Sequence, residues 1–264
     1  LVVGANTSTF LWGQKRGGKT SVLQVLASEM SARSDVTCLI LRMGELAALH
    51  EGQIAHTILC RIYESLGKND EAPSEDAFGA GLGRLVPYIE RISRRLPKHK
   101  FVVIIDEFDD LDAAFYTGER GRLFVKALRS LSEVGLAFFF VGSERMNAIY
   151  QNHVSDLNKW TNFSLDRIES VDDCAALIRK PVESVIEYDE VAVRNIVRYC
   201  AGNPFYMHLL CSQIFRRCVQ ERRTYVGESD VDDVRRVLLR QLGPTNFAHF
   251  WEDNPELLLG DKKR

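Results

Sequence analysis

A glycine-rich turn near the start of the chain restricts its fold more than any other segment. Residues 13–20 read GQKRGGKT, which matches the pattern G-x-x-x-x-G-K-[ST] at every position. The apolar run Thr9–Trp12 precedes this turn, and apolar residues recur at helical spacing through Ser21–Met30. A strand, a glycine-rich loop and a helix in this order predict a phosphate-binding loop at one edge of an α/β sheet.

The residue types of this turn suit one kind of ligand. Glycines let successive N–H groups converge on phosphate oxygens, Lys19 brings positive charge to the β- and γ-phosphates, and the Thr20 hydroxyl can ligate Mg²⁺. A glycine-rich hairpin beside an exposed lysine is the alternative that involves no ligand. We expect a purine nucleoside triphosphate and Mg²⁺ to bind here.

A pair of acids follows the apolar, β-branched run Phe101–Ile105, which is typical of a strand covered on both faces. Asp106 and Glu107 would therefore lie at the carboxyl edge of a parallel sheet, where open α/β sheets bind ligands. We predict that Asp106 holds Mg²⁺ through water and that Glu107 orients and deprotonates an attacking water. The alternative is that the acidic run only solvates a loop, which is the role we expect for Asp109 and Asp110.

A third polar group, Gly142–Arg145, follows the buried run Leu136–Val141. Ser143 or Arg145 could contact the γ-phosphate or position the water, since a guanidinium binds phosphate oxygens in a bidentate way. A capping role for Ser143 and a surface role for Arg145 are the alternatives. Arg129 is a weaker candidate for an arginine finger that acts within the chain or on a neighbour, and a surface role is the alternative. The predicted catalytic residues are Lys19, Glu107 and Arg145.

Strands and helices alternate over the first two thirds of the chain, which predicts a parallel sheet of about five strands flanked by helices. The expected strands are Thr9–Trp12, Val36–Leu41, Phe101–Ile105, Leu136–Val141 and Asn162–Leu165. The expected helices are Ser21–Met30, Ile54–Leu66, Leu85–Leu96 and Gly121–Val134, and residues 67–83 are expected to form a surface loop.

Four helix-like segments without intervening strands follow, at Ser170–Glu187, Val191–Ala201, Pro204–Arg222 and Glu228–Leu242. We therefore expect an α/β nucleotide-binding domain at residues 1–168, an all-α lid subdomain at 169–243, and the start of a winged helix or a linker at 244–264. Between two of the helices, Gly202 suits a helix C-cap and Pro204 the first turn of the next helix. This turn is either a plain corner or a contact to the base or ribose.

The predicted nucleotide contacts are Gly13, Gln14, Lys15, Arg16, Gly17, Gly18, Lys19, Thr20, Ser21, Ser143 and Pro204, and the predicted metal ligands are Thr20 and Asp106.

Charge and composition bear on three further possibilities: nucleic-acid binding, membrane binding and a cysteine site. The net charge of -2 gives no global sign of nucleic-acid or membrane binding, and no apolar run approaches the length of a membrane span, so we expect a cytoplasmic protein. The six cysteines form no C-x-x-C pair, and we interpret them as buried reduced thiols; a metal or redox site with Cys211, Cys218 and His208 is the alternative. Because the chain starts at Leu1, we expect a fragment of a longer protein.

The order of these motifs resembles the STAND class of signal-transduction ATPases and their AAA-like relatives. The similar segments read FLWGQKRGGKTSVLQ, VVIIDEFDDL, FFFVGSERM, LIRKPVE and AGNPFYMHLLC, and they cover most of Phe10–Ile214. Arg145 takes the position of the sensor arginine of that class. The Gly-Arg-Glu segment that helps hold adenine there is missing, so adenine specificity is implied by the resemblance alone.

The resemblance implies a slowly hydrolysing ATPase that acts as a molecular switch. In that class the sheet carries ATP, a helical subdomain and a winged helix close over it, and sensor and effector regions lie outside. A trigger, for example a phage protein, permits ATP-bound homo-oligomerisation and effector activation, often in prokaryotic antiviral defence. The alternatives are a DNA-binding AAA-like ATPase that resembles origin-recognition initiators, and a scaffold that does not hydrolyse ATP.

Overall fold

The computed structural model describes residues 8–46, 49–79, 81–110 and 115–241. These residues form two compact units. The first contains residues 8–12 and 19–164, and the second contains residues 13–18 and 165–241. The expected segment 244–264 lies outside the described residues, and the expected boundary after residue 168 stays a prediction.

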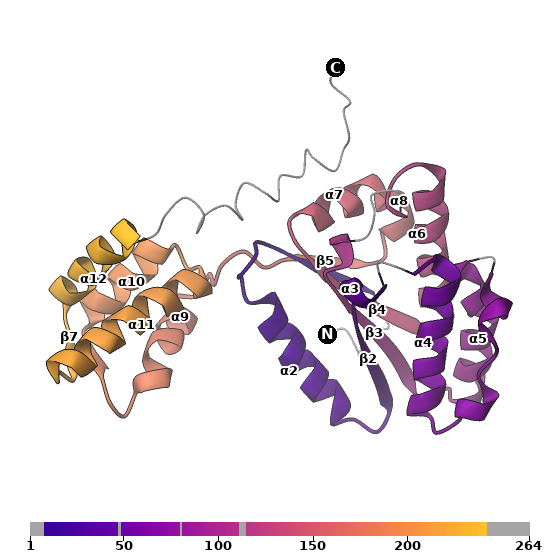
Figure 1. The fold of residues 1–264 in the computed structure, drawn as a ribbon, viewed down its shortest axis with the longest axis horizontal. Coiled ribbons are helices and arrows are strands. Elements are labelled where there is room, and N and C mark those ends of the chain that lie inside the picture. Colours follow the sequence, from indigo (N-terminus) through magenta and orange to yellow (C-terminus); the bar gives the residue numbers. More distant parts are fainter. Residues whose placement is uncertain (1–7, 47–48, 80, 111–114, 242–264) are drawn as a thin grey trace, which may run out of the picture. The chain divides into compact units, whose positions relative to one another are not determined.

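The first unit is built on a sheet of five parallel strands in the order β2-β3-β4-β1-β5 (Figure 1). The strands are β1 (Thr9–Trp12), β2 (Val36–Arg42), β3 (Lys100–Asp106), β4 (Leu136–Gly142) and β5 (Thr161–Ser164). Each predicted strand is thus present, with ends within one residue of the prediction. Because all strands run in the same direction, the segments that follow them emerge at one edge of the sheet.

Helices cover the two faces of this sheet. They are α2 (Lys19–Ser31), α3 (Met43–Leu46), α4 (Glu51–Ser65), α5 (Val86–Arg95), α6 (Gly118–Glu133), α7 (Arg145–Asn152) and α8 (Val154–Leu157). Figure 1 shows α2 on one side of the sheet and α4, α5 and α6 on the opposite side. This arrangement confirms the α/β class expected from the alternation of strands and helices.

Aromatic rings pack together in the core of the first unit. The Phe140 ring on β4 lies 4.1 Å from the Phe108 ring, 5.2 Å from Phe10 on β1 and 5.7 Å from Trp160, measured between centroids. All four side chains are buried. These contacts pack β1 and β4 against the segment that follows β3. They therefore help to hold the carboxyl ends of the three strands next to one another.

The expected surface loop at residues 67–83 is more ordered than its polar composition suggests. It forms the 3-10 turns η1 (Asn69–Glu71), η2 (Glu75–Phe78) and the start of η3 (Leu82–Leu85), and it buries Phe78 and Leu82. A Cβ on Gly52 of α4 would lie 2.3 Å from the Phe78 carbonyl oxygen, so the segment packs directly against α4. The segment lies at the surface as expected, since most of its described residues are exposed, but two buried apolar side chains hold it against the core.

The second unit is helical, as expected, with two short strands that the sequence did not predict. Its elements are α9 (Val171–Arg179), η6 (Lys180–Val182), β6 (Glu187–Tyr188), α10 (Glu190–Cys200), α11 (Pro204–Glu221), β7 (Tyr225–Val226) and α12 (Glu228–Gln241). The helix expected at Ser170–Glu187 is shorter than predicted, because the chain passes into η6, which contains Pro181, and then pairs with β7.

The cysteines contribute to packing rather than to a reactive site. Cys174, Cys200 and Cys218 are buried, whereas the other three are only half-buried. Burial raises the pKa of the Cys200 and Cys211 thiols to about 12, which keeps them protonated and unreactive at neutral pH. Within the described residues no three His, Cys, Asp or Glu side chains form a group that could hold a metal, so Cys211, Cys218 and His208 do not form one.

In the described part of the chain, no helix combines the length and the apolar composition that crossing a bilayer requires.

We predict that Phe140→Ala lowers the free energy of unfolding by about 3–5 kcal/mol, because it removes a ring from a closely packed core. Phe163→Ala is the matched control on the same sheet, since the Phe163 side chain is 45% exposed, and it should cost less than about 1 kcal/mol. Urea unfolding followed by circular dichroism measures both. Equal losses would contradict the described packing.

Candidate functional site

The loop Gly13–Gly18 joins β1 to α2 and is held in shape by its glycines. A Cβ on Gly13 would lie 2.1 Å from the Leu165 carbonyl oxygen, and Gly18 has a φ of 95°, which side chains disfavour. Arg16 also adopts a left-handed φ of 68°. Lys19 and Thr20 are the first two residues of α2, so their side chains start where unpaired N–H groups and the helix dipole favour an anion.

The two neighbouring acids lie where β3 ends, and the second of them has a strained backbone. Asp106 is the last residue of the strand and is half-buried, while Glu107 is exposed. Glu107 has a left-handed φ of 58°, and its N–H donates to Asp106 Oδ1 at 3.1 Å. Such a conformation is uncommon outside glycine and is often found at functional sites. The two neighbouring acids therefore differ in exposure, since Asp106 is half-buried and Glu107 is exposed.

Asp109 is a structural residue, contrary to our expectation of a solvated acid. Its side chain is 3% exposed and accepts hydrogen bonds from the Ser143 N–H at 3.0 and 3.2 Å and from the Ser143 hydroxyl. A Cβ on Gly142 would lie 2.0 Å from Asp109 Oδ1, so only glycine fits there. Asp110, by contrast, is exposed. The buried bond joins the turns that follow β3 and β4.

Ser143 and Arg145 begin the segment after β4. The Ser143 oxygen also accepts from the Arg145 N–H at 3.3 Å, a local bond that favours the capping interpretation of Ser143. Arg145 is half-buried, and its guanidinium forms no ion pair with any residue that the structure describes. It is thus a cation at the same sheet edge as Asp106, as the sequence suggested.

Arg129 lies at the wrong end of the sheet for the role considered above. It pairs with Glu133 at 3.1 Å and with Asp156 at 3.9 Å. Together with Ser8, which precedes β1, it lines a cavity of about 220 Å³. This position is at the amino end of the strands, so Arg129 cannot act as an arginine finger on a nucleotide of its own chain.

In the second unit, the corner between α10 and α11 is defined by backbone contacts. Ala201 is the left-handed C-cap of α10, one residue before the glycine that we expected in that role. The Gly202 carbonyl accepts from the Ile168 N–H at 2.9 Å, and a Cβ on Gly202 would lie 2.5 Å from the Ile168 carbonyl oxygen. Pro204 starts α11, and the Asn203 side chain caps this helix by accepting from the Phe205 and Tyr206 N–H groups.

The loop Gly13–Gly18 packs with this corner inside the second unit. The Arg16 guanidinium lies 4.5 Å from the centroid of the Phe205 ring, and a Cβ on Gly18 would be 3.9 Å from Pro204 Cγ. Cation and ring are therefore within the range of a favourable cation–π contact. The predicted loop residues and Pro204, far apart in the sequence, are thus close together.

A cavity of about 450 Å³ adjoins the loop on this side. It is lined by Gln14, Asp166, Arg167, Tyr199, Cys200, Ala201, Asn203 and Tyr206. Partial burial raises the pKa of the Tyr206 hydroxyl, and the positive charge of Arg16 lowers it in part. Of these residues the sequence analysis identified only Gln14 as a contact. Tyr199 and Tyr206 lie close to Gly202 in the sequence, and these two aromatic residues could have indicated a ligand-binding cavity at this corner.

Comparison with known proteins supports the fold. No family model matches the chain, and no curated protein matches it. Among solved structures, it is similar to a Walker-type ATPase of Pyrococcus abyssi, with a TM-score of 0.59, 13% identity, and coverage of 96% of this chain and 73% of that one.

Two further structures are similar. One is the Aeropyrum pernix Orc1 protein in complex with DNA (TM-score 0.52, 15% identity, 88% of this chain covered). The other is the Thermotoga maritima RuvB Holliday junction branch migration motor (TM-score 0.52, 16% identity, 88% of this chain covered). The chain spans 59% of the Orc1 chain and 62% of the RuvB chain. At these identities the likeness shows the fold: the chain has the P-loop NTPase fold.

We predict that Asp109→Ala lowers the free energy of unfolding by about 1–3 kcal/mol, because it leaves the buried Ser143 N–H and hydroxyl without their acceptor. Asp109→Asn retains one acceptor oxygen and should lose less. Thermal unfolding of both variants and the wild type tests this. A stability equal to the wild type in Asp109→Ala would show that the side chain is solvated after all.

Proposed function

We propose that this chain is the ATP-binding and slowly hydrolysing module of a STAND-like molecular switch. The observation that carries the proposal is the contact of the loop Gly13–Gly18 with the Gly202–Phe205 corner through Arg16 and Phe205. Because this loop also follows β1 and leads into α2, a phosphate bound on it would act on both the sheet and the helical unit. An enzyme that only turns over ATP does not need a contact between its phosphate-binding loop and a helical unit.

In this proposal the loop and the start of α2 hold the phosphates. The backbone of residues 13–18 and the first turn of α2, which includes Ser21, would surround the phosphates, and Lys19 would supply charge to the β- and γ-phosphates. Thr20 and Asp106 offer a hydroxyl and a carboxylate, the hard oxygen ligands that Mg²⁺ prefers. When bound, Mg²⁺ would neutralise charge between the β- and γ-phosphates.

Hydrolysis would depend on two side chains at the same sheet edge. The exposed Glu107 carboxylate, held in its strained turn by Asp106, would orient the attacking water and accept its proton. Arg145 would bind γ-phosphate oxygens with a guanidinium that has no ion pair in the described chain. Asp109 would keep both segments in place through Ser143.

The base would enter the cavity of about 450 Å³ beside the loop. Tyr199 and Tyr206 offer aromatic surface for a purine, and Asn203 and Gln14 offer polar groups at its border. Adenine as the base rests on the resemblance to STAND ATPases. A base in this position would contact the α10–α11 corner directly, which would make the helical unit sensitive to nucleotide.

The switch itself also rests on that resemblance. The module would be cytoplasmic, would receive a trigger through a sensor region, and would form homo-oligomers in the ATP-bound state to activate an effector, with antiviral defence as the setting.

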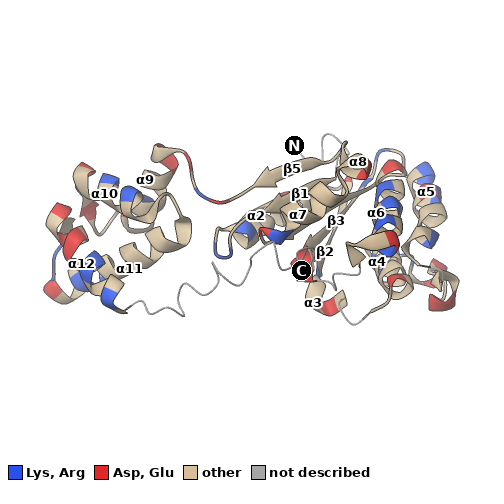
Figure 2. Cartoon of the chain, turned by 90° about the horizontal axis from the view of Figure 1, so that it is seen from above, with Lys and Arg blue, Asp and Glu red and all other residues tan. Residues whose placement is uncertain are grey.

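The DNA-binding alternative is less consistent with the charges of the helical unit. Arg217, Arg223 and Arg236 each form an ion pair with an acid of α11 or α12. Figure 2 shows both signs of charge on α10 and α12. A filter-binding titration with duplex DNA at two salt concentrations would separate the two functions, since phosphate contacts weaken steeply with salt.

We predict that Lys19→Ala weakens ATP binding at least about tenfold, because it removes a charge-assisted bond to the phosphates. Glu107→Gln should bind ATP like the wild type but lower kcat about 10²–10⁴-fold, since it removes only the base. Lys126→Ala, at an exposed position of α6, is the control and should change neither quantity. Calorimetric titration measures ATP binding, and a phosphate-release assay measures kcat. Equal turnover by the wild type and Glu107→Gln would reject the role of Glu107.

We predict that Phe205→Ala keeps ATP binding within about tenfold of the wild type but uncouples the corner from the loop, because one cation–π contact is worth only ~0.5–2 kcal/mol. Hydrogen exchange of residues 199–206 with and without ATP is the measurement. ATP should slow this exchange in the wild type and much less in Phe205→Ala. Phe215→Ala on the same helix, at a 36% exposed side chain away from the loop, is the control. The same protection in all three proteins would contradict coupling through this contact.

A further inference from the structure

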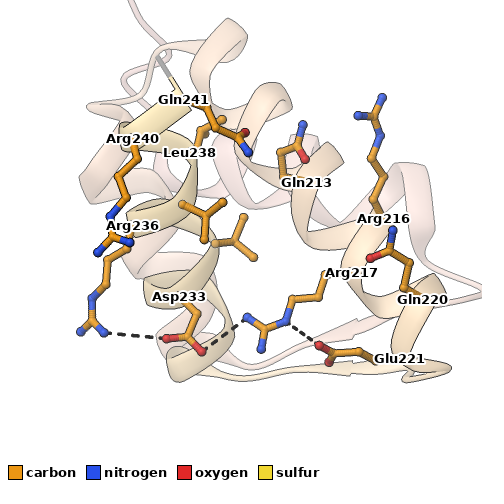
Figure 3. A pocket seen from close by; sticks show the side chains of 12 residues that line it. Gln213, Arg216, Arg217, Gln220, Glu221, Asp233, Arg236, Leu238, Arg240 and Gln241 are labelled. Atoms are coloured by element: carbon orange, nitrogen blue, oxygen red, sulfur yellow. Dashed lines mark hydrogen bonds and ion pairs between the residues drawn. The ribbon is translucent and has the colours of Figure 1, made fainter. Parts of the chain in front are cut away.

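A groove between α11 and α12 is not explained by nucleotide binding. Its volume is about 750 Å³, and it is lined by Gln213, Arg216, Arg217, Gln220, Glu221, Asp233, Val234, Arg236, Val237, Leu238, Arg240 and Gln241. Figure 3 shows Arg236 and Arg240 on one helix and Arg216 and Arg217 on the other. The loop Gly13–Gly18 contributes no residue to it.

The charges of this groove are only partly balanced. Arg217 is held by Glu221 at 2.8 Å and by Asp233 at 3.4 Å, and Arg236 lies 3.8 Å from Asp233. Arg216 and Arg240 are exposed and form no ion pair with any described residue. Four arginines against two acids leave a net positive charge, so the groove favours an acidic occupant.

The groove also has an apolar side. Val234, Val237 and Leu238 line it, and Val237 is 53% exposed. Exposed apolar surface beside unpaired arginines suits a segment that carries acids and large apolar residues together. A nucleic-acid backbone fits less well, because Glu221 and Asp233 line the same groove and would repel phosphates.

We propose that this groove binds the chain's own segment 250–259, which reads FWEDNPELLL. The segment combines the acids Glu252, Asp253 and Glu256 with two aromatic residues and three leucines. The acids would pair with Arg216 and Arg240, and the apolar side chains would cover the exposed Val237 and the half-buried Leu238. The docked segment would then tie whatever follows α12 to the helical unit.

The connection between groove and segment is short enough for this. Gln241, the last residue of α12, itself lines the groove, and Gly243 and Pro244 follow it, residue types that end helices. The connecting residues 242–249 can span up to about 26 Å, whereas the α12 wall from Asp233 to Gln241 rises only about 12 Å. The tether also gives the segment an effective concentration on the order of millimolar, which favours it over a free partner.

Hydrogen exchange of the whole chain 1–264 tests the proposal without any nucleotide. In the wild type, exchange of residues 250–259 should be at least about tenfold slower than in a free peptide of that sequence. The protection should be lost in Arg216→Glu/Arg240→Glu and in Glu252→Lys/Asp253→Lys/Glu256→Lys. Combining the two sets, which restores opposite charges, should recover a large part of it.

The control is Arg194→Glu/Arg222→Glu, which makes the same change of charge at two exposed positions outside the groove and should keep the protection. Free-peptide exchange rates in the wild type would overturn the proposal, as would protection that survives both charge reversals. Protection that rises with protein concentration would also overturn it, because the occupant would then be a second copy. Duplex DNA that displaces the segment at low salt only would show a phosphate site instead.

Discussion

The parallel pairing of β1 with β4 is the constraint on which the site depends. Trp12 lies opposite Gly142 in this register, so the glycine-rich loop and the segment Ser143–Arg145 leave the sheet at the same level. β3 pairs with the other side of β4 and ends in Asp106. The rings of Phe10, Phe108 and Phe140 pack beneath these strand ends and hold the levels in place.

A buried hydrogen bond holds the turns after β3 and β4 together. Asp109 accepts from Ser143 across the turns after β3 and β4, and Glu107, two residues before Asp109, has a left-handed φ of 58°. This bond connects the segment after β3, which carries Glu107, to the segment after β4, which carries Arg145. Such a connection would suit the hydrolysis that we propose, since groups that are already oriented need not be ordered in the transition state.

Much of this fold could be predicted because its signals are local. The strands are continuous apolar runs, and the loop at residues 13–20 has a composition that phosphate binding explains residue by residue. The features that were missed depend on tertiary contacts. Nothing adjacent to Asp109 shows that it meets Ser143, 34 positions away, and only packing on α4 distinguishes the segment of Phe78 from a solvated loop. The cavity beside the loop was missed for the same reason, because Asp166 and Tyr199 meet only in the folded unit.

The roles proposed for Asp106, Glu107 and Arg145 all depend on a nucleotide that binds at the loop Gly13–Gly18. Calorimetric titration of the wild-type chain with ATP, with Mg²⁺ and again with excess chelator, measures this most directly. We expect a single ATP to bind per chain, with weaker binding when Mg²⁺ is removed and also when GTP replaces ATP. An absence of binding heat under all conditions, or binding that Lys19→Ala leaves intact, would contradict it.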